Sequence, residues 1–426
     1  MGMIIRNGHV INPVTQTDGA LDLRVEDGVV TEIAEWIEAK PRDEEINAGG
    51  CYVIPGLIDL HVHLRDPGFT EKEDLDSGTA AAVAGGFTTI CAMPNTSPVA
   101  DDPSVICDVQ NRADALGRCK VYQIGSITRG MQGKELVDFD AMVAAGCKGF
   151  SEDGRSVMNS RLMRHAMQNT ARLSVPILDH CEDIDLVEGG VMNAGDRAKQ
   201  LGLPGITNAV ENCIAARDIM LAEETGARLH ICHCSTQELV DLVWDAKMRD
   251  AKVSGEVCPH HFVLTDADIP DAMAAQYKMN PPLRSREDVD ELIWGLANNV
   301  MDVISTDHAP HTAEEKARGF IEAPFGIVGL ETSLALTYTY LVRTQQMTLS
   351  QMVAKMSINP AHVLGIDRGN IAVGKTADIT VFDPGEEYEI HASAFHGRAA
   401  NMPYEGMKVY GRVRYTISEG RVIFAG

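Results

Sequence analysis

Two histidines separated by one residue, His61 and His63, end an apolar run, and Arg65 follows at the same spacing. Side chains alternate between the faces of a β-strand, so all three can project to one side. Paired imidazoles at a strand end are a typical start of a transition-metal site, and a neighbouring cation could hold an anionic substrate. A buried strand with two hydrogen-bonded histidines explains the pattern equally well, so the rest of the chain must decide.

Further side chains that bind metals follow later apolar runs. His180 and His233 add two imidazoles, and Asp307 adds a carboxylate, which completes a set suited to zinc with positions left open for water. Asp153 could add a carboxylate between two metals, which lie roughly 3.5–4 Å apart in such sites. Taken singly, His180 and His233 are also explained as satisfied core histidines.

The other histidines are interpreted differently. His230 is treated as structural, while His165 and His362 lie in helical surroundings and are taken as unrelated to the site. His260 and His261 follow a predicted strand, so one of them could line the site, but neither is assigned as a ligand.

The elements that must position these residues repeat along the middle of the chain. Apolar β-prone runs alternate with helical stretches at residues such as 74–84, 209–225 and 238–250, which predicts a parallel sheet. Eight such units fit a closed (β/α)8 TIM-type barrel, whose active site lies at the carboxyl ends of the strands. An open doubly wound sheet is the alternative, although no glycine-rich dinucleotide motif follows the first strand. The predicted strands are 54–61, 88–93, 120–124, 147–150, 175–178, 228–232, 252–257 and 302–305.

Both ends of the chain are rich in short β-prone runs. Residues 1–54 carry the turn signals Asn7-Gly8 and Asp27-Gly28, and residues 367–426 have the same texture. Each end is too small to bury a core alone, so we expect the two to combine into one small β-sandwich domain. The catalytic barrel then spans residues 55–366.

Composition narrows the functional class. The 426 residues include 37 Lys and Arg against 61 Asp and Glu, a net charge of −24, which argues against a nucleic-acid or anionic-membrane surface. We expect neither a signal peptide nor a membrane span of about 18 apolar residues. The ten cysteines form no C-x-x-C pair, which favours free thiols in a reducing cytoplasm.

Four short motifs are more specific than the general pattern of metal ligands after strands. They are residues 61–68 (HVHLRDPG), 93–95 (MPN), 280–284 (NPPLR) and 307–311 (DHAPH). Through them the chain resembles dihydroorotases of the amidohydrolase superfamily, specifically the class I bacterial type, and the resemblance covers essentially the whole chain.

The resemblance implies zinc bound by His61, His63 and Asp307, with a second metal position served by His180 and His233. Many relatives bridge the two metals with a carboxylated lysine after strand four. This chain has Asp153 there, and Lys148 falls too early, so Asp153 is the implied bridge. Either one or two zincs fit, and two are favoured.

The resemblance also implies contacts with the substrate. Arg65 can pair with the carboxylate of dihydroorotate through two parallel hydrogen bonds, and amides can read the ring or its carboxylate. The loop at 312–325 is charged and contains glycine, which is typical of a loop that closes over a substrate. The implied contacts are His63, Arg65, Asn95, Asn280, His311, Phe325 and Gly326.

The expected activity is the reversible cyclisation of N-carbamoyl-L-aspartate to L-dihydroorotate in pyrimidine synthesis, with Asp307 carrying the proton. A dihydropyrimidinase, hydantoinase or allantoinase is the nearest rival, but a neutral ring does not need Arg65, and the lysine of the hydantoinase-like relatives is missing. An inactive homologue that assembles with aspartate transcarbamoylase is a second rival, although such proteins usually lose metal ligands. A homodimer is expected, and association with aspartate transcarbamoylase is compatible with activity.

Overall fold

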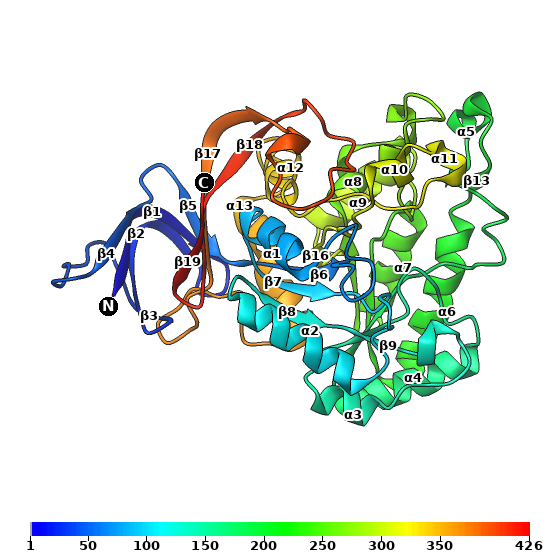
Figure 1. Cartoon of the computed structure of the whole chain (residues 1–426), viewed down its shortest axis with the longest axis horizontal. Helices are drawn as coiled ribbons and strands as arrows, with labels where there is room; N and C mark the ends of the chain where they lie inside the picture. Colours follow the sequence, from blue (N-terminus) through cyan, green and yellow to red (C-terminus); the bar gives the residue numbers. More distant parts are fainter. Residues whose placement is uncertain (1) are drawn as a thin grey trace.

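The strands of the computed structural model, which describes residues 2–426, divide between a central barrel and a sheet made from both chain ends (Figure 1). No helix within these residues is long and apolar enough to cross a membrane. The strands are β1 (Met3–Asn12), β2 (Thr17–Glu26), β3 (Val29–Ala34), β4 (Glu44–Asn47), β5 (Tyr52–Pro55), β6 (Leu57–Val62), β7 (Phe87–Ala92), β8 (Lys120–Gln123), β9 (Gly125–Ser126), β10 (Phe150–Ser151), β11 (Pro176–Asp179), β12 (Met192–Asn193), β13 (Gly205–Ile206), β14 (Arg228–Ile231), β15 (Val253–Val257), β16 (Val303–Ile304), β17 (Ile379–Glu389), β18 (Lys408–Ser418) and β19 (Arg421–Ala425). The α-helices are α1 (Leu75–Ala84), α2 (Pro103–Leu116), α3 (Phe139–Ala144), α4 (Ser160–Leu173), α5 (Asp196–Leu201), α6 (Ala209–Thr225), α7 (Gln237–Met248), α8 (Pro259–Val263), α9 (Arg286–Ala297), α10 (Ala313–Lys316), α11 (Gly319–Glu322), α12 (Ser333–Thr337), α13 (Leu349–Val353) and α14 (Asn359–Leu364).

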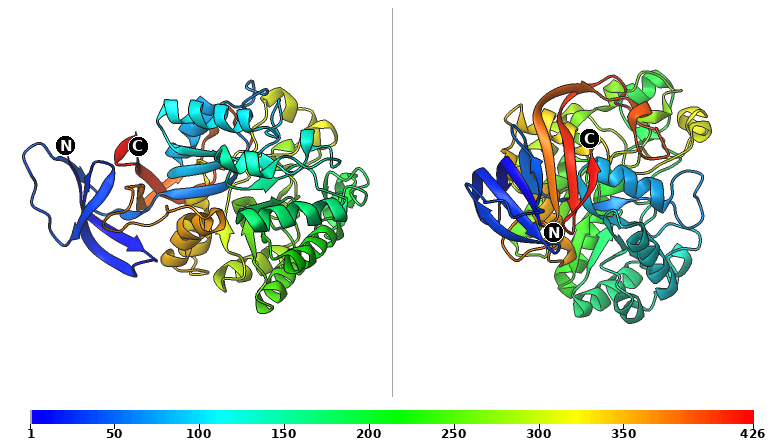
Figure 2. Two further views of the ribbon diagram at one scale, coloured as in Figure 1. Left: turned by 90° about the horizontal axis from the view of Figure 1, so that it is seen from below. Right: turned by 60° about the vertical axis from the view of Figure 1, so that its left-hand side comes forward.

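Parallel strands form the ring of the barrel. In order they are β6, β7, β8 continued by β9, β10, β11, β14, β15 and β16, which makes eight positions. The amide of Ile124, between β8 and β9, donates to the carbonyl of Ala92 at 2.9 Å and joins the two sheets. A bridge between Val62 and His308 links the last strand to the first. The predicted (β/α)8 fold is confirmed, and helices cover the outside of the ring (Figure 2).

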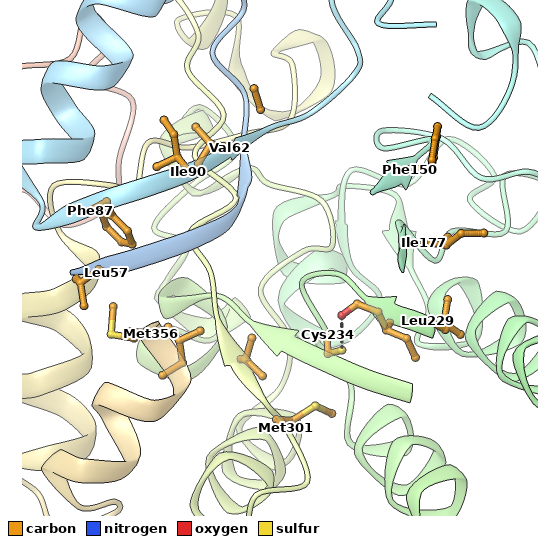
Figure 3. Packing of buried hydrophobic residues seen from close by; sticks show 14 of the residues in the cluster. Leu57, Val62, Phe87, Ile90, Phe150, Ile177, Leu229, Cys234, Met301 and Met356 are labelled. Atoms are coloured by element: carbon orange, nitrogen blue, oxygen red, sulfur yellow. Dashed lines mark hydrogen bonds between the residues drawn. The ribbon is translucent and has the colours of Figure 1, made fainter. Parts of the chain in front are cut away.

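Strand β6 shows how the barrel buries its two faces. Leu57 and Val62 belong to the large apolar cluster shared with the helices, part of which is seen in Figure 3. Ile58 and Leu60 belong to a separate cluster with Leu178 of β11 and other strand residues. Burial of apolar surface on both faces stabilises the strand by about 25 cal/mol per Å². The nearly uninterrupted apolar run before His61 therefore reflects a strand that is covered on both sides.

The sheet at the chain ends has the order β19-β18-β17-β5-β1-β2-β3, with β4 paired to β1. Strand β5 pairs with β1 from the N-terminal part and with β17 from the C-terminal part, so hydrogen bonding is continuous. Ile5, Val53, Val381 and Ile417 from both ends share one apolar cluster. The expected β unit is thus one mixed sheet, and it lies beside the barrel (Figure 2).

Two predicted elements differ clearly from the structure. The strand predicted at 54–61 is divided at Gly56, because Ile54 and Pro55 belong to β5 and β6 begins only at Leu57. The Gly56 amide donates to the carbonyl of Asp378, and a Cβ there would lie 2.2 Å from the hydroxyl oxygen of Thr88. The segment 312–325, predicted as a loop, contains the short helices α10 and α11.

Asp59 secures the closure of the barrel. Its fully buried carboxylate accepts hydrogen bonds from the amides of His61, at 2.9 Å, and Thr306, at 3.2 Å. Asp59→Ala should lower the free energy of unfolding by about 2–4 kcal/mol, because two buried donors lose their acceptor. Chemical denaturation monitored by circular dichroism measures this loss. Asp59→Asn keeps an acceptor oxygen and should cost less; equal losses for the two variants would contradict this role.

Candidate metal centre and substrate pocket

The predicted metal ligands meet at the carboxyl end of the barrel. His61 lies near the end of β6, and Asp153, His180, His233 and Asp307 follow β10, β11, β14 and β16 within three residues of each strand's end. All are buried. Asp307 and His233 have positive φ values of 46° and 35°, a conformation that costs free energy in residues other than glycine. Parallel strands that end together bring these side chains, distant in sequence, into one cluster.

Asp153 lies at the centre of the cluster. Its Oδ1 atom is 3.1 Å from Nε2 of His61, 3.4 Å from Nδ1 of His180 and 3.6 Å from Nε2 of His233. Its Oδ2 atom faces Nε2 of His63 at 3.3 Å. The two carboxylate oxygens therefore face different imidazoles, as a ligand shared between two ions would.

Asp307 closes the cluster from the last strand. Its Oδ1 atom is 3.2 Å from Nε2 of His63 and 3.6 Å from Nε2 of His61. One possible ligand atom from each of these three residues lies within 4.8 Å of the others, and the same holds for His61, Asp153 and His233. Such spacing allows several ligands to reach one ion.

Hydrogen bonds on the outer side of His61, His63 and His180 direct the other nitrogen of each of these rings to the centre. Nδ1 of His61 is 2.9 Å from the Glu256 carboxylate, and Nδ1 of His63 is 2.9 Å from Oδ1 of Asn95. Each acceptor requires a proton on Nδ1, which leaves the lone pair of Nε2 facing Asp153. His180 is turned the other way, with Nε2 on Glu182 at 3.2 Å and Nδ1 at the centre.

The residues fit a divalent cation. Nε2 of His61 and Oδ1 of Asp153 are buried and have no hydrogen-bond partner, which is costly unless another species occupies the space between them. Burial opposes ionisation of Asp153, yet His61, His180 and His233 hold its pKa well below the ordinary value. Burial likewise opposes protonation of His180, but Asp153 and Glu182 raise its pKa to about 10. The carboxylates thus create a field that favours positive charge.

Lys148 does not approach this cluster. Its ammonium nitrogen lies 5.9 Å from the centre of the Tyr122 ring, on β8, and the residue does not line the pocket. The side chain that lies among the imidazoles is that of Asp153.

Glu256 and Asp59 support the cluster but were missed in the sequence. Glu256, on β15, contacts His61 and also Nε2 of His230, at 3.0 Å. Burial alone would raise the pKa of Glu256, but hydrogen bonds from the two histidines hold it well below its ordinary value. The available signal was an acidic residue inside a run predicted to be a buried strand. His230, treated as structural, belongs to this supporting layer.

A pocket of about 200 Å³ opens beside the metal ligands. It is lined by every predicted substrate contact, namely His63, Arg65, Asn95, Asn280, His311, Phe325 and Gly326. Arg65 reaches it differently from the prediction, because β6 ends at Val62 and Arg65 has a φ of 59°. Of the three residues, only His61 lies within β6; His63 directly follows the strand, and strand alternation does not extend to Arg65.

Arg65 presents a buried cation to this pocket. Its Nε donates to the carbonyl of Pro310 at 3.2 Å, and its Nη2 lies 3.3 Å from Nε2 of His311; among the described residues it forms no ion pair with a carboxylate within 4.0 Å. Burial lowers its pKa from the ordinary value, although guanidinium remains the charged form under all physiological conditions. A planar cation with free donors in a small pocket is suited to a carboxylate ligand.

His311 stands between Arg65 and the segment after β16. Its Nε2 is 2.8 Å from the carbonyl of Phe325, and its Nδ1 is 3.4 Å from the ammonium of Lys72. These partners require the proton on Nε2. Burial and then the charges of Arg65 and Lys72 lower the pKa of His311 to about 3, so the ring is neutral at physiological pH. His311 therefore offers hydrogen bonds rather than charge.

Asn280 and the unassigned histidines complete the comparison with the prediction. Asn280 donates to Glu182 at 2.8 Å, which connects a pocket residue to the partner of His180. His260 and His261 are buried but do not line the pocket. Their side chains and Cys258 form a separate group of potential ligand atoms.

Family models and curated proteins match this chain in sequence. Residues 50–239 match the family described as dihydro-orotase-like, and residues 305–424 match the amidohydrolase family. The chain is 45% identical to a dihydroorotase of Acetivibrio thermocellus, over 99% of this chain and 98% of the relative. It is 44% identical to a dihydroorotase of Trichlorobacter lovleyi, over the whole of both chains.

Solved structures share the fold at lower identity. An L-hydantoinase (dihydropyrimidinase) from Arthrobacter aurescens is 26% identical with a TM-score of 0.85, covering 99% of this chain and 95% of the other. A dihydropyrimidinase from Brevibacillus agri is 24% identical with a TM-score of 0.84 and the same coverage.

Glu256 provides a test of metal binding that does not alter a ligand. Glu256→Gln should weaken the affinity for a divalent metal ion about 10–100-fold, because the amide no longer holds His61 as a charged acceptor does. Competition with a chromophoric chelator measures the affinity. Glu331→Gln is the matched control, since Glu331 is a largely buried carboxylate paired with His396 at 2.9 Å that does not line the pocket. Equal affinities for both variants and the parent would exclude this support.

Proposed function

The chain belongs to the dihydroorotase family, and from that membership and the pocket we propose that it interconverts N-carbamoyl-L-aspartate and L-dihydroorotate, the ring-closing reaction of pyrimidine biosynthesis. One observation carries the assignment: the buried guanidinium of Arg65 faces the pocket without a carboxylate partner, beside the imidazole–carboxylate cluster. Dihydroorotate has one carboxylate, which Arg65 could bind, and a cyclic amide, which could face the imidazole–carboxylate cluster. The amidohydrolase family and the ligand clusters indicate a metal cofactor.

The proposed cofactor is zinc, in two positions. His61, His63 and Asp307 would hold one ion, and His180 and His233 the other, with Asp153 shared between them. Oδ1 of Asp153 faces His61 of the first position and His180 and His233 of the second, which supports a shared carboxylate. Zinc bound there would polarise the ring carbonyl and lower the pKa of a water molecule to about 7.

Asp307 is the proposed proton carrier. In the hydrolytic direction, the oxygen of water bonds to the ring carbonyl carbon, and the bond from that carbon to the ring nitrogen breaks. Asp307 accepts the proton that water loses and delivers it to the departing nitrogen. Its buried carboxylate lines the pocket, and neighbouring histidines lower its pKa against the effect of burial, so it is ionised and ready to accept. Cyclisation follows the same steps in reverse.

The pocket residues are proposed to orient the substrate. Arg65 and Asn95 would bind its carboxylate, and Asn280 would read a ring carbonyl or N–H. His63 and the neutral His311 would add contacts, and the backbone at Phe325 and Gly326 would form one wall. A pocket of about 200 Å³ suits a single small ring.

The assembly and location are also proposals. We infer a cytoplasmic homodimer, with association with aspartate transcarbamoylase as a further state. Light scattering of the purified chain, with and without aspartate transcarbamoylase, tests the two assembly states. A monomer would contradict the homodimer, and a mass that the second enzyme leaves unchanged would contradict the association.

Asp307→Asn tests the proton carrier. The amide can still contact metal through its oxygen but cannot accept the proton, so turnover should fall about 10²–10⁴-fold while bound zinc is retained. Steady-state rates and elemental analysis of the same preparation measure the two quantities. Asp302→Asn, before the start of β16 at the other end of the barrel, should keep full activity. Full activity of Asp307→Asn would contradict the assignment.

Arg65→Met tests the substrate class. In the zinc-loaded parent, we expect turnover of L-dihydroorotate but not of dihydrouracil or allantoin, followed by the change in ultraviolet absorbance. Losing two hydrogen bonds to a charged group should lower kcat/KM for dihydroorotate roughly 100-fold or more. Arg172→Met, at an exposed pair with Asp140, is the control. Turnover of the neutral rings instead would place the protein among the hydantoinases.

A further inference from the structure

Two buried lysines lie behind the pocket wall. The side chains of Lys278 and Lys316 belong to residues that are only 3% and 7% exposed. Every hydrogen bond that their ammonium groups make goes to a backbone carbonyl, and neither forms an ion pair within 4.0 Å in residues 2–426. Burying a charge without an opposite charge is costly, so this arrangement calls for a reason.

The acceptors of these bonds belong mostly to one short segment, residues 320–326. Lys278 donates to the carbonyls of Phe320 and Ala323, each at 2.6 Å, and its ammonium lies 4.4 Å from the centre of the Phe325 ring. Lys316 donates to the carbonyls of Pro324, at 3.1 Å, and Gly326, at 2.8 Å.

Lys278 and Lys316 are also joined to each other. The carbonyl of Lys278 accepts from Nζ of Lys316 at 3.1 Å and from the amide of Gly326 at 3.0 Å. The two ammonium groups thus determine where four carbonyls of an irregular segment point. Hydrogen bonds from a charged donor contribute about 1.5–3 kcal/mol each, more than those from a neutral donor.

Residues 325 and 326 of this segment form part of the pocket wall, and their backbone has little room to move. The Phe325 carbonyl accepts from His311, and Phe325 and Gly326 both line the pocket. Gly326 has a φ of 132°, and a Cβ there would lie 2.7 Å from Cβ of Ala309 and 3.1 Å from Nε2 of His311. Even a small displacement of this backbone would change the pocket.

We propose that Lys278 and Lys316 are positioning residues that set the backbone of Phe325 and Gly326 for substrate binding. Neither lysine lines the pocket, so both act through the segment that they hold. The inference rests on the proposed function. It adds two residues that help to determine substrate specificity although they do not contact the substrate. Burial lowers the pKa of Lys278 to about 8 and, with the charge of Lys278, that of Lys316 to about 7.

Lys316→Met tests the proposal, with Lys355→Met as the matched control. Lys355 is 1% exposed, and its ammonium donates to the Met301 carbonyl and the Asn299 side chain, before β16 at the opposite end of the barrel. Lys316→Met should raise KM for dihydroorotate about tenfold, with kcat within about threefold and zinc content unchanged, because the wall contacts the substrate before and during reaction. Lys355→Met should leave both constants unchanged.

Hydrogen exchange gives a readout that does not depend on activity. Amides in residues 320–326 should exchange faster in Lys316→Met than in the parent or in Lys355→Met. Lys316→Gln keeps two N–H donors and should recover part of the KM change. Should Lys316→Met fail to fold, Lys278→Met is subject to the same criteria.

The outcomes separate this inference from the proposed function. An active parent with unchanged KM and unchanged exchange in the folded lysine variant would overturn the inference alone. A parent that turns over none of the rings would overturn the proposed function, and unchanged exchange would then reject the structural role of the lysines as well.

Discussion

The contact between the Asp153 carboxylate and the imidazoles around it is the constraint on which the site depends. A carboxylate and several histidines cannot be buried together without compensation, because each polar atom removed from water needs a partner. His61, His180 and His233 surround one oxygen of Asp153, and His63 faces the other. A barrel meets this requirement because its strands end around one axis, so residues from different β/α units converge without long loops.

A second layer keeps the imidazoles in place. Glu256 joins His61 to His230 inside the barrel, and Asp59 connects the first and last strands through backbone amides. Both carboxylates are fully buried and accept hydrogen bonds, so they orient the groups around them as well as fill space. Glu256 also determines which nitrogen of the His61 ring faces the centre.

A buried cation faces the pocket of this acidic protein. The chain carries a net charge of −24, yet Arg65 lines the small pocket at the barrel mouth, and Lys278 and Lys316 lie behind its wall. At distances of a few ångströms in a buried site, these local cations outweigh the distant and solvent-screened surface charge. Arg65 faces the pocket directly, whereas the lysines act on its wall. This separation allows one group to recognise charge while the others maintain shape.

The sequence by itself determined the barrel, the union of the chain ends in one β unit, and the residues that meet around the pocket. Alternating apolar runs, the H-x-H pair and polar residues after successive strands are local patterns, and local patterns are visible in a sequence. Tertiary structure alone decided the division of the first predicted strand at Gly56, the left-handed turn that brings Arg65 into the pocket, and the helices within 312–325. It also decided the roles of Asp59 and Glu256 and the placement of Lys278 and Lys316. These features depend on contacts between residues far apart in the chain, where a buried charge has its partner on another element.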